Sequence, residues 1–295
     1  MRLGVIADPH LALERVEDTS WHNPFRLADA HERLDVALAD PLLDGADVIV
    51  VLGDLAHFGD RTSVRYVVES LANCDRPAIA LSGNHDVMTR GVRLEDEVRA
   101  LGAPNLASPL AWTAEAPAAK AFEAAAAGLA VHEVVREADR RHQPFDVTGR
   151  RMVVADSDTN VDVWLTHFPI LSFENRCRDA DLHYSAHLDY LAPPPEVLPA
   201  ASGPVVVLSG HLHLRGATTE ANVLQLAFAA LVEAPYEVAT VDIDVEAGSV
   251  FYKCASVRAP DADRLPVLDP PTDRWYFDQP SGRWSRTGRR RMAGT

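Results

Sequence analysis

Short, mostly apolar runs recur along the chain, and five of them lead directly into residues that can bind metal ions. The five runs cover residues 3–7, 48–52, 78–81, 161–165 and 205–208. Runs of this length that are rich in β-branched residues and bounded by Gly or polar residues predict buried strands of a largely parallel sheet. In open α/β sheets, ligands bind beyond the carboxyl ends of the strands. We therefore expect the residues that follow the five runs to lie together.

Helical periodicity fills the gaps between these predicted strands. Apolar residues at helical spacing predict helices over roughly residues 26–43, 64–71 and 94–101. An alanine-rich stretch further along predicts two short helices, over 118–127 and 129–140, because alanine has the highest helix propensity. Strands that alternate with helices are typical of βαβ units with a parallel sheet.

The second half of the chain has a different pattern. It predicts strands over residues 152–155, 223–228, 237–244 and 249–255, with a hairpin turn at 244–248. Antiparallel strands after a parallel series indicate a second sheet packed on the first. From residue 259 onward prolines and then arginines cluster, so we expect a domain of residues 1–258 and a tail, 259–295, that either wraps over the domain or is disordered.

Composition narrows the class of protein. A chain of 295 residues can form one large α/β domain or two small ones. Its formal net charge of −15 argues against a protein that coats nucleic acid or an anionic membrane. The three cysteines are scattered and form no C-x-x-C pair, which predicts a reducing compartment. With no signal-peptide pattern and no apolar stretch of membrane-spanning length, the sequence predicts a soluble, cytoplasmic protein.

The residues that follow the five runs offer a mixed set of nitrogen and oxygen donors. They are Asp8, His10, Asp54, Asn84, His167, His211 and His213. Mixed donors suit Mn, Fe, Zn, Co or Ni better than Mg or Ca. Seven ligands exceed what one ion with an open position needs, but they fit two divalent metal ions that share a carboxylate and lie about 3.5–4 Å apart.

Charge points from this site to its substrate. Two divalent ions and two carboxylates leave a net charge of about +2, which a bridging hydroxide lowers to about +1. A positive pocket on an acidic protein suits an anionic centre such as a phosphate ester, attacked by a metal-bound hydroxide. The expected partner is a small phosphoester, such as a nucleotide, and neither nucleic acid nor a membrane is expected.

The ordered motifs D-x-H, G-D, G-N-H-D, H and G-H-x-H, between residues 3 and 213, resemble the calcineurin-like metallophosphoesterase superfamily. The resemblance implies an α/β fold of two facing mixed β-sheets flanked by helices, an α/β/β/α sandwich. It implies that one metal is held by Asp8, His10, Asp54 and His213. It implies that the other metal is held by Asp54, Asn84, His167 and His211, with Asp54 as the bridge.

The same resemblance gives His85 a catalytic role outside the metal shell. It would protonate the leaving oxygen or stabilise the charge that develops on the phosphoryl group. Asp86, the next residue, is a candidate to orient His85.

Departures from the motifs bear on the subfamily. Protein Ser/Thr phosphatases have Asp and Arg where this chain has His57 and Phe58, and they end the third motif in Glu instead of Asp86. Purple acid phosphatases place a metal-binding Tyr at the position of His57. Cyclic-nucleotide phosphodiesterases often have two adjacent histidines in the fourth motif, where this chain has only His167. The segment G-D-L-A-H, which ends at His57, is similar to the Mre11-type nucleases.

Three further residues are candidates to bind substrate. His57 either touches the substrate or a metal-bound water, or it forms a local hydrogen bond. His22 lies beside Trp21 in a loop that either contacts substrate or is a surface loop with one packed tryptophan. Arg176 either grips a second phosphate group or has no part in the site.

We interpret the chain as an enzyme that most closely resembles the phosphodiesterase branches, because it has G-N-H-D with a histidine outside the metal shell. The first alternative is a phosphomonoesterase. The second is a nuclease that uses Trp284 and the arginines of the tail to hold nucleic acid. The third is a non-catalytic scaffold stabilised by metal.

Overall fold

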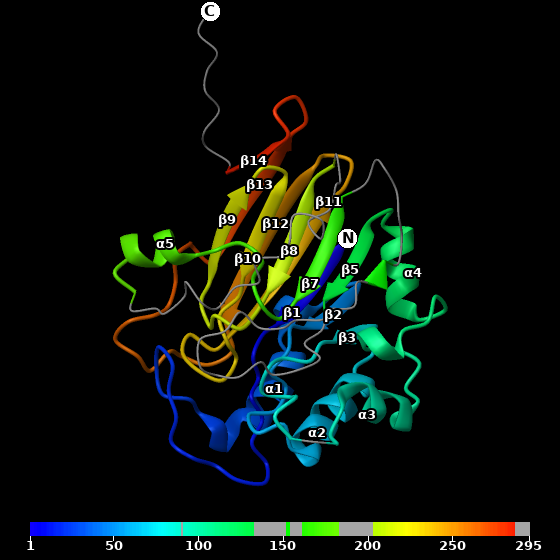
Figure 1. The fold of residues 1–295 in the computed structure, drawn as a ribbon, viewed down its shortest axis with the longest axis vertical. Helices are drawn as coiled ribbons and strands as arrows, with labels where there is room; N and C mark the ends of the chain where they lie inside the picture. The colour runs from blue at the N-terminus through cyan, green and yellow to red at the C-terminus, as the bar shows by residue number, and fades with distance from the viewer. Residues whose placement is uncertain (90, 133–151, 154–160, 183–202, 287–295) are drawn as a thin grey trace, which may run out of the picture.

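Two β-sheets face each other in the computed structural model, which describes residues 1–89, 91–132, 152–153, 161–182 and 203–286 (Figure 1). The larger sheet has eight strands in the order β14-β13-β12-β11-β1-β2-β3-β4. Its strands are β1 (Arg2–Ile6), β2 (Val48–Val51), β3 (Ala78–Ala80), β4 (Leu106–Ala107), β11 (Glu237–Asp244), β12 (Ser249–Ser256), β13 (Thr272–Asp278) and β14 (Arg283–Arg286). Strands β1 to β4 are parallel, and β11 joins β1 in antiparallel pairing.

The smaller sheet has six strands in the order β6-β5-β7-β8-β10-β9. Its strands are β5 (Gly128–His132), β6 (Met152–Val153), β7 (Asp162–Thr166), β8 (Val205–Ser209), β9 (Gly216–Glu220) and β10 (Val223–Ala227). The four central strands are parallel, and β6 and β9 pair antiparallel at the edges. Both sheets are therefore mixed, as the sequence predicts.

Helices lie along the larger sheet. They are α1 (Ala30–Leu38), α2 (Arg61–Ala72) and α3 (Leu94–Leu101), with short 3₁₀ helices η1 (Leu27–Asp29) and η2 (Pro41–Leu43) beside α1. Further along the chain come η3 (Pro109–Ala111), α4 (Pro117–Ala124) and α5 (Glu174–Asp179). The single helix predicted over 26–43 is thus divided into three pieces. Pro41 has no amide hydrogen to donate, and its ring disfavours helical backbone at Asp40.

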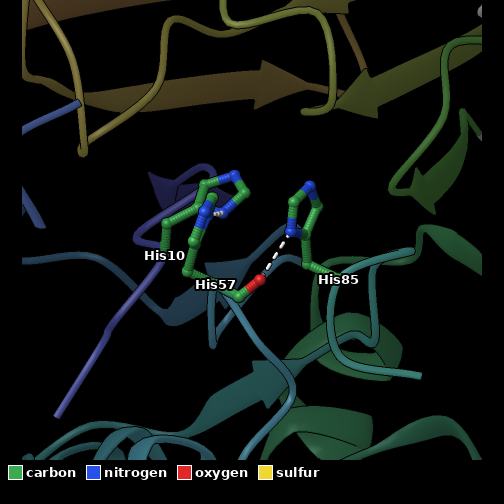
Figure 2. Close-up of side chains that lie close together, drawn as sticks. All are labelled: His10, His57 and His85. Atoms are coloured by element: carbon green, nitrogen blue, oxygen red, sulfur yellow. Dashed lines mark hydrogen bonds between the residues drawn. The ribbon is translucent and has the colours of Figure 1, made fainter. Parts of the chain in front are cut away.

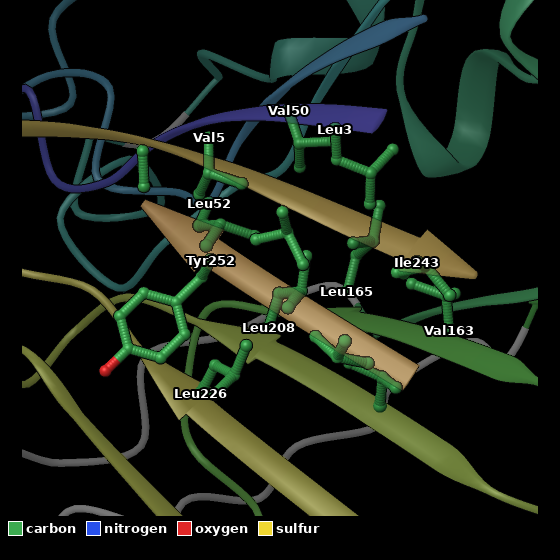
Figure 3. Packing of buried hydrophobic residues seen from close by; sticks show 14 of the residues in the cluster. Leu3, Val5, Val50, Leu52, Val163, Leu165, Leu208, Leu226, Ile243 and Tyr252 are labelled. Atoms are coloured by element: carbon green, nitrogen blue, oxygen red, sulfur yellow. The ribbon is translucent and has the colours of Figure 1, made fainter. Parts of the chain in front are cut away.

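The two largest hydrophobic clusters of the described residues lie on opposite faces of the larger sheet. Between the sheets, Val5 and Val50 face Leu165 and Leu208 in a continuous buried cluster (Figure 3). On the other face, alternate residues of the same strands pack against α1, α2 and α3. Alternation of this kind leaves β1, β2 and β3 buried on both faces, which is why they read as continuous apolar runs.

The helix predicted over residues 129–140 is wrong over the part that the structure describes. Residues 128–132 form β5, which pairs in parallel with β7. Leu129 and Val131 enter the core between the sheets, whereas Ala130 packs on the opposite face beside Trp164. This two-residue alternation, and burial against β7, outweigh the helix propensity of the alanines. Residues 133–140 lie outside the described residues.

The sheet assignment of the later strands is also corrected. Strands β11 and β12 form the predicted hairpin, with Asp244 opposite Ser249. They do not begin the second sheet, because β11 pairs with β1 along its length and so extends the first sheet. The second sheet is formed instead by the strands between residues 128 and 227.

The proline- and arginine-rich segment contributes two strands to the larger sheet. Strand β13 pairs with β12, and β14 pairs with β13. Trp275, Phe277 and Trp284 from these strands are buried in the core cluster between the sheets. The division into a domain of residues 1–258 and a tail stays a prediction about which part folds by itself, and residues 287–295 lie outside the described residues.

Among the described residues, no helix has both the length and the hydropathy that a membrane span requires.

Candidate metal centre

The seven predicted ligands lie in the loops that follow β1, β2, β3, β7 and β8. Five of them have left-handed backbone, with φ between 46° and 65°: Asp8, His10, Asp54, His211 and His213. A non-glycine residue in this region costs about 1–3 kcal/mol, and such residues concentrate at functional sites. The backbone at the strand ends is therefore bent at the ligand positions themselves.

Three of the predicted ligands form a first cluster. The donor atoms of Asp8, His10 and His213 lie within 4.8 Å of one another, and all three side chains are buried. The Nε2 atoms of His10 and His213 face each other at 3.2 Å. The Nε2 atom of His213 is 3.8 Å from Oδ1 of Asp8.

A second cluster lies beside the first. The donor atoms of Asp54, His167 and His211 also lie within 4.8 Å of one another and are buried. Nε2 of His167 is 2.9 Å from Oδ1 of Asn84. The structure thus brings together all seven predicted ligands in two adjoining groups.

The carboxylate of Asp54 lies between the two groups. Its Oδ2 atom is 3.4 Å from Nε2 of His10 in the first cluster and 3.4 Å from Nε2 of His167 in the second. One oxygen within reach of both clusters is the arrangement that a shared carboxylate requires.

The donor atoms of the second cluster fit a cation. The ring of His167 is fixed from the outside, because its Nδ1 donates to the carbonyl of Leu52 at 2.8 Å, so Nε2 is the atom that faces Asp54 and Asn84. In the neutral ring, Nε2 would bring a lone pair against two oxygens, which a cation between them stabilises. Nε2 of His211 is buried and makes no hydrogen bond with the described residues, a state that buried polar atoms rarely adopt without a ligand.

Burial and charge set the protonation of these groups. Burial holds the pKa of His10 and of His211 well below the usual value, so both rings are neutral and can bind a metal. For His167, burial acts to lower the pKa, but the charges of Asp54 and Asp8 and the hydrogen bonds of the ring together outweigh it and raise the pKa to about 9. Without a metal, a proton on His167 offsets the negative charge of Asp54. A divalent cation bound beside the ring would offset the same charge.

The pKa values of the carboxylates of Asp8 and Asp54 are shifted in opposite directions. Burial raises the pKa of Asp8 to about 6, against the opposing charges of His213 and His167. Burial also acts to raise the pKa of Asp54, but the neighbouring His167 and His85 hold it well below its usual value. Asp54 is thus the more firmly ionised of the two, as suits the residue between the clusters.

Two motif glycines are required by the closeness of these carboxylates. A Cβ atom on Gly210 would lie 2.7 Å from Oδ2 of Asp8. A Cβ atom on Gly83 would overlap the carboxylate and the amide of Asp54. The backbone can approach each carboxylate only without a side chain, and the amide of His211 then donates to both oxygens of Asp8 at 3.0 Å.

His85 lies beside the clusters with one ring nitrogen already fixed (Figure 2). Its Nδ1 donates to the backbone carbonyl of His57 at 2.6 Å, and its backbone amide donates to Oδ1 of Asp54 at 2.8 Å. The ring centroids of His85 and His10 are 4.6 Å apart. With Nδ1 engaged, Nε2 is the atom of His85 that can exchange a proton with a substrate.

The prediction that Asp86 orients His85 is wrong, because Asp86 binds backbone amides of two loops. Its carboxylate accepts from the backbone amides of Leu55, Ala56 and Gly83 at 2.8–3.0 Å. Burial raises the pKa of Asp86 to about 7, an effect that these three donors oppose. Asp86 therefore holds the loop of the third motif against the loop of the second, whereas the His57 carbonyl orients His85.

The imidazole of His57 is buried beside both His10 and His85. Its Nδ1 lies 3.1 Å from Nδ1 of His10, and its ring stacks on His85 with centroids 4.9 Å apart (Figure 2). The donor atoms of His10, His57 and His85 also lie within 4.8 Å of one another. Of the three predicted substrate contacts, His57 is in direct contact with His10 of the first cluster.

The other two predicted substrate contacts are placed differently. Nε2 of His22 bonds the carbonyl of Leu212, the residue between the two histidines of the fifth motif, at 3.1 Å. Arg176 forms a two-pronged ion pair with Asp269, at 2.7 and 3.1 Å, and bonds the carbonyl of Ala217. Binding a phosphate through Arg176 would break this pair, so its predicted role conflicts with the contact that it makes.

One buried acid beside the clusters was not predicted from the sequence. Glu233 is fully buried in the loop after β10, and it accepts from Nδ1 of His213 at 2.7 Å. Its other oxygen accepts from the amide of Asn23 at 2.6 Å. The feature of the sequence that could have indicated Glu233 is its place as the one acidic residue in the apolar segment from Leu231 to Tyr236.

Taken together, the two facing sheets and the paired ligand clusters define the class of metal-dependent phosphoesterases. A family model described as calcineurin-like phosphoesterase matches residues 1–215, and the chain belongs to this family. A comparison with curated proteins found no match.

The chain is similar to several solved structures at low sequence identity, and the first of them shows the same fold. A dimetal phosphatase from Danio rerio is 13% identical with a TM-score of 0.55, covering 88% of this chain and 96% of its own. A phosphoesterase from E. coli, Yfce, is 18% identical with a TM-score of 0.40, covering 88% and 94%. An archaeal phosphodiesterase is 12% identical with a TM-score of 0.37, covering 82% and 93%.

Proposed function

We propose that this chain hydrolyses a small phosphodiester at a centre of two divalent metal ions. The observation that carries the proposal is the place of Asp54, whose Oδ2 is 3.4 Å from a ring nitrogen of each ligand cluster. When bound, two divalent cations supply a nucleophile from water and offset the charge of the phosphate. The donor set of imidazoles, carboxylates and one amide favours Mn, Fe, Zn, Co or Ni.

The ligand assignment follows the two clusters. Asp8, His10 and His213 hold one cation, and His167, His211 and Asn84 hold the other, with Asp54 shared between them. His85 is the proposed general acid, because its Nδ1 is held by the His57 carbonyl and its Nε2 remains to protonate the leaving oxygen.

Preference for a diester over a monoester rests on the motif pattern around His85. The dimetal phosphatase from Danio rerio has the same fold, and this likeness does not distinguish a diester from a monoester substrate. The phosphomonoesterase therefore stays an alternative. The nuclease alternative is less favoured, because Trp284 is buried in the core between the sheets and its ring is not available to stack on bases. A nucleotide as the substrate and a cytoplasmic location stay predictions from the sequence.

Hydrolysis of bis-p-nitrophenyl phosphate and of p-nitrophenyl phosphate, side by side with Mn²⁺, tests the proposal. We expect a higher kcat/KM for the diester, with Asp54→Asn as the inactive control. Faster cleavage of the monoester would replace the diesterase by the phosphatase. If neither ester is cleaved with any of the five metals while two ions are bound, the chain is a metal-stabilised scaffold.

A further inference from the structure

Trp21 is a partly exposed aromatic side chain beside the metal ligands. It is 41% exposed, although large apolar side chains are mostly buried in this chain. Its ring centroid lies 5.6 Å from that of His213, tilted by 30°, and 5.9 Å from that of His211. One part of the indole thus packs on proposed ligands of both metals, and the exposed part of the side chain lies next to them.

The turn that carries Trp21 is fixed to the metal centre. The amide of Trp21 donates to the carbonyl of Asn23 at 3.3 Å, and Ser20 bridges to Pro24 across the turn. The amide of Asn23 donates to Glu233, the same carboxylate that holds the ring of His213. The loop that carries the indole is therefore held by the same carboxylate as His213, which is a proposed metal ligand.

Phe25 extends the aromatic surface from the other end of the same loop. Its ring lies 5.2 Å from that of His213 and 5.3 Å from that of His10. Together, Trp21 and Phe25 line the first cluster with two rings that carry no charge. We call this pair the aromatic wall.

The chemistry of the aromatic wall selects for a flat, uncharged group. Indole faces stack on planar π-systems, and stacking of a base on an aromatic side chain tolerates any base. The phosphate of such a substrate would sit on the cations, and the group esterified to it would reach the neighbouring indole. Selection by stacking also suits a chain with a net charge of −15, which does not attract polyanions.

We propose that the exposed part of Trp21 is a stacking subsite for a planar aromatic group of the substrate, such as a nucleobase or an aryl ring. The inference rests on the proposed function, because it deepens the substrate class of the same centre. It separates esters of nucleosides and aryl alcohols from esters of sugars and aliphatic alcohols.

Two diesters with one leaving group test the subsite. Bis-p-nitrophenyl phosphate and methyl p-nitrophenyl phosphate both release p-nitrophenol, but only the first keeps an aryl ring on the other side of phosphorus. The ratio to measure is kcat/KM for the bis-p-nitrophenyl ester divided by kcat/KM for the methyl ester, with Mn²⁺ bound. This ratio should be about 5- to 100-fold lower in Trp21→Ala than in the unsubstituted protein, the usual effect of losing one stacking contact. Trp21→Phe should recover most of the ratio.

A matched control and a count of bound metal separate stacking from structural damage. Tyr276→Ala removes another exposed aromatic ring, on β13, and should leave the ratio unchanged. If Trp21→Ala lowers both rates equally and releases metal, the indole supports His213 and the subsite is overturned. An unchanged ratio in Trp21→Ala also overturns it.

A binding measurement gives an answer even if no diester is cleaved. Adenosine 5′-monophosphate and ribose 5-phosphate carry the same phosphate, and only the first carries a base. Calorimetric titration of the Mn²⁺-loaded protein should show the nucleotide binding about 5- to 100-fold more tightly, with most of that preference lost in Trp21→Ala. Equal affinities in the unsubstituted protein would overturn the subsite, whereas a preference without hydrolysis would count against the proposed reaction alone.

Discussion

His213 donates from Nδ1 to the carboxylate of Glu233 at 2.7 Å, and both side chains are buried. The bond fixes which nitrogen carries the proton, so Nε2 faces Asp8 and His10. Burial acts to lower the pKa of His213, but the charges of Asp8 and Glu233 outweigh it and raise the pKa. Glu233 also accepts from the amide of Asn23, so one carboxylate positions a candidate metal ligand and the loop that carries Asn23.

Glu233→Gln should weaken metal binding by about 10- to 100-fold, the usual effect of losing a carboxylate behind a ligand histidine. Gln keeps the shape but not the charge that supports the imidazole of His213. Calorimetric titration with Mn²⁺ measures the change. Glu220→Gln, at an exposed position on β9, is the matched control. Equal Mn²⁺ affinity in Glu233→Gln and the control would show that the charge has no part in the metal centre.

Asp54→Asn should weaken the binding of both ions at once, because Oδ2 of Asp54 is 3.4 Å from a ring nitrogen in each cluster. Asp8→Asn should mainly weaken one ion, since Asp8 belongs to the first cluster only. Metal content after dialysis against a fixed Mn²⁺ concentration compares the two variants. Two ions retained by Asp54→Asn would refute its role as the bridge.

His57→Ala should weaken the binding of the ion at His10 by about 10- to 100-fold, because Nδ1 of His57 lies 3.1 Å from Nδ1 of His10 and helps to hold that ring. The contact with His85 should survive, since it uses the backbone carbonyl of His57. We therefore expect kcat to be restored at saturating Mn²⁺. His31→Ala, on α1, controls for the loss of a histidine. A low kcat that Mn²⁺ does not restore would instead place the ring of His57 on the substrate.

His85→Ala should lower turnover by about 10²- to 10⁴-fold and leave the metal content unchanged, the usual result of removing a general acid. The backbone bond from residue 85 to Asp54 remains in the variant. The loss should be greater for an ester with an aliphatic leaving group than for one that releases p-nitrophenol, which needs no proton. An equal loss for both leaving groups would mean that His85 stabilises charge and does not donate a proton.

The clustering of the candidate ligands could be predicted from the sequence because it follows from local features. Each ligand comes directly after a strand, and parallel strands of one sheet end at the same edge. Glu233 could not be assigned in this way, because its partner His213 is 20 residues away and the bond between them depends on the packing of two loops. The same holds for the contact of His57 with His10, which joins the loops after β1 and β2.

Sheet membership depends on pairing that the sequence does not encode locally. The hairpin of β11 and β12 is a local feature, but its place beside β1 depends on contacts with residues near the N-terminus. The stretch around Leu129 illustrates the opposite error, because a local propensity for helix lost to burial against β7. Local patterns therefore predicted which polar side chains lie together, and they predicted the hairpin, but they did not predict which sheet each later strand joins.

Trp284→Ala should destabilise the fold by about 3–5 kcal/mol, the usual cost of removing a buried tryptophan. The ring is 6% exposed, packs against Phe277 with centroids 5.4 Å apart, and donates from Nε1 to the carbonyl of Asn222 at 2.8 Å. Urea denaturation measures the free energy of unfolding. Tyr276→Ala, exposed on the neighbouring strand, should change it by less than about 0.5 kcal/mol. If Trp284→Ala is equally mild while nucleic-acid binding is lost, the tryptophan is a binding residue, and the β14 segment does not help to hold the two sheets together.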